Sequence, residues 1–205
     1  MVNDLQIDAL KEFVNIGIGK AADVLNAMLE SPVELKAIDV FVLDKNQIDE
    51  ILTSEDNTRL SIVGMEYFGS IEGTSFLVME KADSLKMVKL LVGDMVFDGK
   101  DELDAIRTGT LAEIGNIILN SILGMISNIL DMELSYTVPH YTEETLASLY
   151  KSFFQSEKYS RTVVKIRSNF LVKKKSINGS ILIVFDELTF TEITNHIDKL
   201  LGEQS

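Results

Sequence analysis

The sequence predicts an α/β fold: a single pseudo-twofold-symmetric domain with a six-stranded, mostly antiparallel sheet and two long central helices. Two long helical segments resemble each other, each is followed by segments rich in β-branched and aromatic residues, and similar short motifs close both halves. The 205 residues, 46% of them apolar, suffice for one such domain. Its halves are residues 1–100 and 101–205.

An internal repeat is the basis of this prediction. The segment LKEFVNIGIGKAADVLNAML at residues 10–29 resembles LAEIGNIILNSILGMISNIL at residues 111–130. Further along, SIEGTSFLVME at residues 70–80 resembles SINGSILIVFD at residues 176–186, and the halves close with KLLVG and KLLG. The strand-like segments VELKAIDVFVL at residues 33–43 and MELSYTVPHYT at residues 132–142 are a further match. Four matches in the same order indicate a duplicated unit.

In the first half, the elements follow from periodicity and turn residues. We expect a helix at residues 4–30, a strand at 33–43, strands at 59–67 and 70–80, and a helix at 82–91. The residues YFGSIEG leave only a short connection between the last two strands, which predicts a hairpin.

The second half repeats this order. We expect a helix at residues 102–130, strands at 133–140, 162–172 and 177–185, and a closing helix at 189–201. An additional amphipathic helix is expected in EETLASLYKSFFQS, residues 143–156. The acidic segment GDMVFDGKDELD, residues 93–104, joins the halves and is too short and too apolar for a free linker.

Composition excludes several kinds of function. A formal net charge of −13 disfavours nucleic acid and anionic lipid as partners. The absence of cysteine excludes disulfides and thiolate chemistry, and the two histidines, His140 and His196, lack metal-ligand spacing. The longest uncharged run, residues 114–130, contains three asparagines, so we expect a buried helix and no membrane insertion. With no secretion signal visible at the N-terminus, the prediction is a cytoplasmic protein.

The residues GIGK at positions 17–20 look like a phosphate-binding turn, but they lack its requirements. No strand precedes them, Ala21 follows Lys20 in place of a hydroxyl residue, and the second half has no glycine pair there. Glycine costs about 1 kcal/mol inside a helix. We therefore expect Gly17 and Gly19 to allow close packing or a local kink.

Both halves keep a carboxylate and an amide in the same register. Glu12 and Asn15 in the first helix correspond to Glu113 and Asn116 in the second, and a spacing of three places each pair on one helix face. The neighbouring residues are apolar. Two interpretations are open at this point: a pair of functional sites, or packing amides beside solvated carboxylates.

The doubled L-x-E-x-x-N-I helices resemble the CheC/CheX/FliY family of chemotaxis phosphatases. The stretch NIGIGKAA is similar to the NIGAGNAA-like stretch typical of a first CheC helix, and EIGN is similar to the second. The family signature is Asp or Ser, then Glu four residues later, Asn three beyond, and Pro after 22 further residues. The resemblance covers essentially the whole chain.

The signature transfers to this sequence with one departure in each half. The first motif is Asp8, Glu12 and Asn15, with Ile38 at the proline position. The second is Glu113 and Asn116 with Pro139, and Gly109 stands at the leading Asp or Ser position. Lys20 also differs from the asparagine common in CheC-like sequences.

The resemblance implies a phosphatase that hydrolyses the aspartyl-phosphate of a CheY-like response regulator. Asparagine orients the attacking water and glutamate docks on the receiver's lysine. The chain itself binds no cofactor, because the receiver supplies Mg²⁺; CheD is a further partner within the family. The alternative is a non-catalytic adaptor that binds CheD or a phospho-receiver, or a flagellar-switch component.

Overall fold

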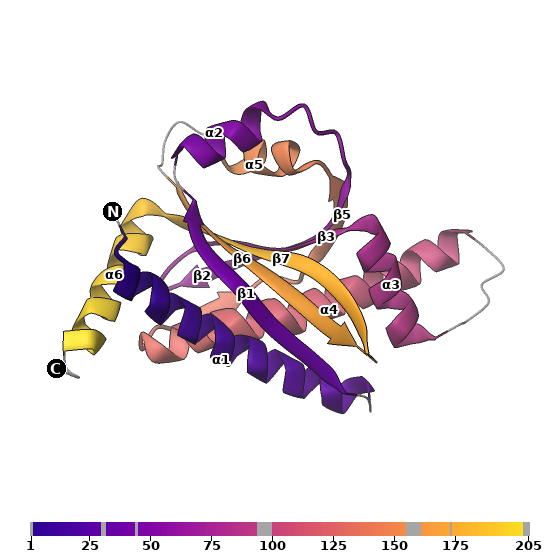
Figure 1. The fold of residues 1–205 in the computed structure, drawn as a ribbon, viewed down its shortest axis with the longest axis horizontal. Coiled ribbons are helices and arrows are strands. Elements are labelled where there is room, and N and C mark those ends of the chain that lie inside the picture. Colours follow the sequence, from indigo (N-terminus) through magenta and orange to yellow (C-terminus); the bar gives the residue numbers. More distant parts are fainter. Residues whose placement is uncertain are drawn as a thin grey trace.

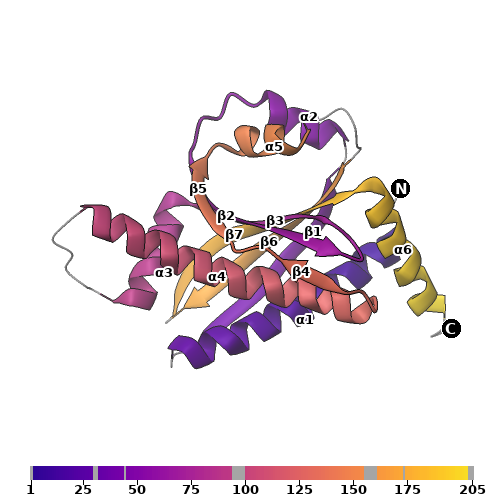
Figure 2. The ribbon, with the colours of Figure 1, turned by 180° about the vertical axis from the view of Figure 1, so that it is seen from behind.

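A computed structural model describes residues 2–29, 32–43, 45–93, 100–154, 161–172 and 174–202. One antiparallel sheet lies between helices on both of its faces (Figure 1). Helices α1 and α4 lie side by side on one face, while α2 and α5 lie over the other (Figure 2). The elements of the first half are α1 (Asp4–Leu29), β1 (Val33–Leu43), α2 (Lys45–Thr53), β2 (Leu60–Gly69), β3 (Gly73–Glu80) and α3 (Lys81–Val92). Those of the second are α4 (Lys100–Ile129), β4 (Leu134–Tyr136), β5 (His140–Glu144), α5 (Leu146–Phe154), β6 (Arg161–Val172), β7 (Lys175–Asp186) and α6 (Glu187–Gly202).

The sheet combines strands from both halves of the sequence. Its order is β1-β6-β7-β3-β2-β4, with β5 also paired to β2, and every pair is antiparallel. If β1 corresponds to β4 and β5, β2 to β6, and β3 to β7, this order reads the same from either edge. A duplicated unit would give this arrangement, although the duplication itself stays an inference from sequence.

The α/β class and the antiparallel sheet are confirmed, but the prediction of six strands is wrong by one. The single strand expected at residues 133–140 is divided into β4 and β5, and Pro139, which has no N–H for the ladder, lies in the break. The corresponding place in β1 is a shift in register against β6, between Ala37 and Asp39. The two edge strands are thus irregular at corresponding positions of the two halves.

One helix was missed in the sequence. Residues 45–53, for which no helix or strand was expected, form α2, which packs against α5. Ile48 is buried there, while Ile51 and Leu52 are partly buried, which is the spacing of an amphipathic helix. The segment is short and mostly polar, so this apolar spacing was not recognised in the sequence. Residues 94–99 of the segment that joins the halves lie outside the described residues.

The main core lies between the sheet and the layer formed by α1 and α4. Six residues of α4 are fully inaccessible to solvent: Leu111, Ile114, Ile118, Leu119, Ile122 and Leu123. The segment Ala105–Ile129 is the one described helix long and apolar enough to cross a membrane, and half of its most apolar window is buried inside the protein. A core helix of this kind passes the same compositional test.

Gly17 lies where α1 and α4 contact each other. A Cβ atom at this position would lie 2.7 Å from Cα of Ile122 and 3.0 Å from the carbonyl oxygen of Ser121. Gly19, by contrast, is exposed, and a Cβ atom there would meet nothing within 4 Å. The expectation of close packing therefore holds for Gly17 and is wrong for Gly19.

Replacing Gly17 with alanine is expected to lower the free energy of unfolding by about 1–2 kcal/mol, because overpacking outweighs the gain in helix propensity. Gly19→Ala is the matched control, and it should raise that free energy by up to about 1 kcal/mol. Urea denaturation followed by circular dichroism measures both. Equal effects of the two substitutions would contradict the contact at Gly17.

Candidate functional site

The first motif lies on an open surface of α1. The helix begins with a reciprocal cap: the backbone N–H of Asn3 donates to Oε1 of Gln6 at 3.0 Å, and that of Gln6 donates to Oδ1 of Asn3 at 2.9 Å. Asp8, Glu12 and Asn15 are all exposed, because the helix buries its opposite stripe against the core. The structure therefore presents these three side chains to solvent.

The second motif borders a hollow on the surface. Glu113 is exposed and Asn116 is partly buried, while Ile114 and Ile118 between and beyond them are fully buried. The hollow, of about 420 Å³, is lined by Gly109, Ala112, Glu113, Asn116 and Asn120 of α4 and by Tyr136, Thr137, Val138 and Pro139. The structure thus brings Glu113, Asn116 and Pro139 together around one hollow.

The break between β4 and β5 forms one wall of this hollow. Thr137 is fixed to β2 by two hydrogen bonds of 3.0 Å: its backbone N–H donates to the carbonyl oxygen of Glu66, and its Oγ1 accepts from the N–H of Glu66. Val138, next in the chain, has 87% of its surface exposed. An anchored loop therefore holds an apolar side chain out into solvent beside Glu113 and Asn116.

Ile38 of the first half does not take the place that Pro139 has in the second. Ile38, at the proline position of the first motif, lies on a continuous strand at the register shift of β1. It lines a different cavity on the α2 and α5 side of the sheet, together with Leu146 and Tyr150 of α5. The structure therefore does not bring Ile38 to Glu12 and Asn15.

Asn116 is held by a residue that was not among the predicted site residues. The Nδ2 atom of Asn120, one helical turn further on, donates to Oδ1 of Asn116 at 2.6 Å. The Oδ1 atom of Asn120 is buried and has no hydrogen-bond partner among the described residues. The four-residue spacing of the two asparagines in an apolar helix was the signal that could have identified this pair.

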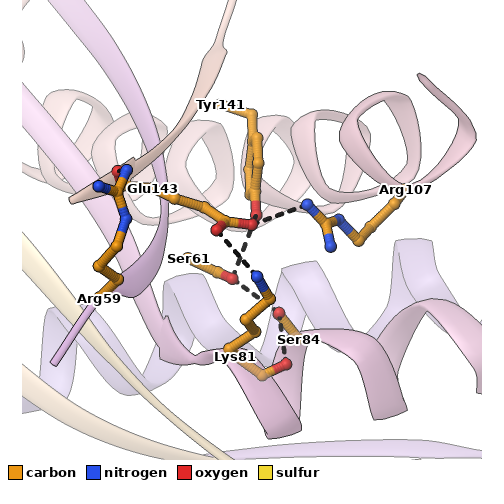
Figure 3. Close-up of polar contacts among 7 residues, drawn as sticks. All are labelled: Arg59, Ser61, Lys81, Ser84, Arg107, Tyr141 and Glu143. Atoms are coloured by element: carbon orange, nitrogen blue, oxygen red, sulfur yellow. Dashed lines mark hydrogen bonds and ion pairs between the residues drawn. The ribbon is translucent and has the colours of Figure 1, made fainter. Parts of the chain in front are cut away.

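A polar cluster around Glu143 supports the same end of α4 (Figure 3). Glu143 accepts hydrogen bonds from Tyr141 Oη at 2.7 Å, Arg107 Nη2 at 2.7 Å and Lys81 Nζ at 3.1 Å. The Oγ atoms of Ser61 and Ser84 lie 2.7 Å apart, and that of Ser61 lies 3.2 Å from Tyr141 Oη. The Glu143 cluster therefore links α3, α4, β2 and β5.

The Glu143 cluster joins α4 to β5, next to both walls of the hollow. Arg107 lies two residues before Gly109 on α4, and β5 begins immediately after Pro139. The hydrogen bond from Tyr141 lowers the pKa of Glu143 the most; burial opposes this effect, and Lys81 and Arg107 lower the pKa further. Glu143 is therefore an ionised anchor at neutral pH.

In the described part of the chain, no three histidine, aspartate or glutamate side chains lie close enough together to hold a metal ion. The polar groups that line the hollow are mainly carboxylate, amide and hydroxyl groups. The amide and hydroxyl groups can each donate and accept hydrogen bonds, so they can orient water without being ionised.

The fold is similar to that of several solved chemotaxis and flagellar proteins. FliY from Thermotoga maritima superposes with a TM-score of 0.73 at 16% identity, covering 97% of this chain and 98% of that one. FliM in a complex with SpeE from H. pylori superposes with a TM-score of 0.64 at 11% identity, and the match covers 97% of each chain. CheX from Borrelia burgdorferi, solved with CheY, BeF3 and Mg, superposes with a TM-score of 0.51 at 17% identity. The match covers 85% of this chain and 99% of that one.

Comparison of the sequence with known proteins adds two similarities to those of the fold. Residues 5–33, which contain Asp8, Glu12 and Asn15, match the CheC-like family. The CheY-P phosphatase CheC of Bacillus subtilis (strain 168) is 24% identical over 139 residues, 67% of this chain and 66% of that protein. The match thus spans about two thirds of the relative's length. Together with the fold, it supports the resemblance of this chain to the CheC/CheX/FliY family.

Replacing Glu143 with glutamine tests whether the Glu143 cluster stabilises the fold through an ionised carboxylate. Because the pKa of Glu143 is lowered in the folded state, its contribution is present above the ordinary value of 4.5 and is lost as the pH falls through the lowered value. At pH 7 the substitution should reduce the free energy of unfolding by about 1–2 kcal/mol, given charge-assisted hydrogen bonds at a partly exposed site.

Urea denaturation at pH 7 and below pH 4 measures this effect, with substitution of the exposed Glu133 by glutamine as the control. The deficit of Glu143→Gln should shrink at the lower pH, where the wild-type carboxyl is protonated. A deficit that stays constant with pH would contradict the role of the ionised group.

Proposed function

We propose that this protein hydrolyses the aspartyl-phosphate of a CheY-like receiver domain, with the hollow on α4 as its principal site. The observation that carries this proposal is the gathering of Glu113, Asn116 and Pro139 around one open hollow. The relative in Bacillus subtilis is named a CheY-P phosphatase, and CheX was solved as a complex with CheY, which supports a receiver as the partner.

In this proposal Asn116 orients the attacking water. The water oxygen bonds to phosphorus while the bond from phosphorus to the aspartyl oxygen breaks, which yields inorganic phosphate and a free carboxylate. A carboxamide can donate to the water and accept from it, so no ionised base is needed. Positioning and electrostatics carry most of the catalysis of phosphoryl transfer. The receiver supplies Mg²⁺ for the phosphoryl charge, and this chain binds no cofactor.

Glu113 is proposed to dock the helix on the receiver. Its carboxylate is exposed one turn before Asn116, so it can pair with the lysine of a receiver site while Asn116 enters that site. Glu12 and Asn15 offer the same pair on α1, with Asp8 a turn earlier, but on an open surface. We therefore propose two sites, of which the one on α4 contributes more.

The cellular setting follows from the same proposal. A cytoplasmic protein would meet its receiver directly, and CheD is proposed as a further partner because the family includes proteins that bind it.

A non-catalytic adaptor or flagellar-switch component is the second candidate function. It is favoured by Gly109, which supplies no side chain at the leading motif position, and by the fold shared with FliM.

Alanine substitutions at the two asparagines separate these candidates. Asn116→Ala should slow dephosphorylation of a phosphorylated CheY-like receiver more than Asn15→Ala does. The double variant should lose on the order of 10²-fold in rate, as expected when a positioned amide is removed. Release of inorganic phosphate measures the rate, and Asn128→Ala, an exposed asparagine of the same helix, is the control.

A double variant as fast as wild type would contradict the mechanism. Wild-type protein that binds the phospho-receiver without accelerating its dephosphorylation would support the adaptor instead.

A substitution at Val138 tests the proposed docking surface separately from the catalytic step. Because the side chain is 87% exposed beside the hollow, contact with a receiver would bury it. Val138→Ser should therefore raise KM about five- to tenfold and leave kcat unchanged. Leu188→Ser is the control, since Leu188 is 79% exposed on α6. An unchanged KM, or the same rise in KM for both variants, would exclude Val138 as a contact.

A further inference from the structure

The side-chain amide of Asn116 has a fixed orientation in the structure. Its Oδ1 accepts from Asn120 Nδ2 at 2.6 Å, and both side chains lie along the same hollow. The hydrogen bond restricts rotation of the Asn116 side chain and directs its own Nδ2 group away from Asn120. An amide held in this way loses less conformational freedom when it meets a receiver-bound water.

The pair has an energetic disadvantage that packing does not explain. The Oδ1 atom of Asn120 is buried without a hydrogen-bond partner among the described residues, and such a group is unfavourable for stability. Its neighbours in α4, Leu119 and Ile118, are fully buried apolar residues. An apolar side chain at position 120 would avoid this penalty, so the asparagine is better explained by its bond to Asn116 than by its contribution to the core.

The first half of the protein lacks this arrangement. One turn beyond Asn15 stands Gly19, which has no side chain to donate a hydrogen bond. The surface there is open, because a Cβ atom on Gly19 would meet nothing within 4 Å. Asn15 is exposed, whereas Asn116 is partly buried. The two otherwise similar motifs therefore differ in whether their asparagine is held in place.

We propose that Asn120 is a positioning residue that holds Asn116 ready to orient the attacking water, and that its absence makes the α1 site the slower of the two. This inference rests on the proposed phosphatase function. It adds a residue that lies outside the Glu, Asn and Pro motif, and it gives a physical reason for unequal sites.

The first test replaces Asn120 with leucine in an Asn15→Ala background, so that only the α4 site acts. Loss of one hydrogen bond should lower kcat about five- to tenfold. The KM for the phospho-receiver should stay constant, because Asn120 acts through Asn116. The midpoint of urea unfolding should stay equal or rise, since a buried unpaired oxygen is removed. A fall in both stability and kcat, or an effect confined to KM, would overturn the positioning role.

The second test adds the missing partner to the first half. Gly19→Asn in an Asn116→Ala background should increase the residual rate several-fold, because the new side chain lies one turn from Asn15. Gly19→Ala in the same background is the matched control and should leave the rate unchanged. A Gly19→Asn rate equal to that of the control would contradict the reason given for the unequal sites.

The third test does not depend on activity. Nuclear magnetic resonance relaxation of the Asn116 side-chain amide should report an ordered group in the wild type, a mobile group in Asn120→Leu, and an ordered group in the control Asn128→Ala. Equal mobility of Asn116 in all three proteins would overturn the inference even if phosphatase activity is found. An ordered Asn116 in a wild-type protein that does not hydrolyse the phospho-receiver would overturn the proposed function and the catalytic role of Asn120, while leaving the hydrogen bond itself established.

Discussion

The close approach of α1 and α4 is the constraint on which the rest of this structure depends. The missing side chain of Gly17 lets the two longest helices meet at backbone distance, with Ile122 of α4 directly opposite. The helices thereby form one layer over the sheet and bury their apolar stripes together. Their remaining faces, which carry Glu12 with Asn15 and Glu113 with Asn116, are left for solvent or for a partner.

The irregular edges of the sheet then make the two motifs different. On one edge, Pro139 divides the strand, and the resulting loop with Val138 forms a wall beside α4. On the other edge, β1 absorbs the same irregularity as a register shift, and Ile38 belongs to a different cavity. Two similar helices therefore carry one motif that borders a walled hollow and one motif on an open surface, and the Glu143 cluster lies next to the hollow.

Patterns that depend on local periodicity could be predicted from the sequence. The long helices, the bounds of β1 at residues 33–43 and the antiparallel hairpin of β2 and β3 all follow from apolar spacing and short turns. Glu113 and Asn116 could be selected because both halves repeat their spacing, and Pro139 only through the resemblance to the family signature. The Glu143 cluster could not, because Lys81, Arg107 and Glu143 are far apart in the chain and meet only through the tertiary fold. The role of Asn120 was missed because its spacing from Asn116 also fits ordinary packing.

The hollow on α4 is proposed to be the surface that meets a receiver domain. Titration of isotope-labelled protein with a BeF3-activated, Mg²⁺-bound CheY-like receiver, followed by amide chemical shifts, tests it most directly. The largest changes are expected at Glu113, Asn116 and Val138, with smaller changes around Asn15. Changes confined to α2 and α5, on the opposite face of the sheet, would contradict it.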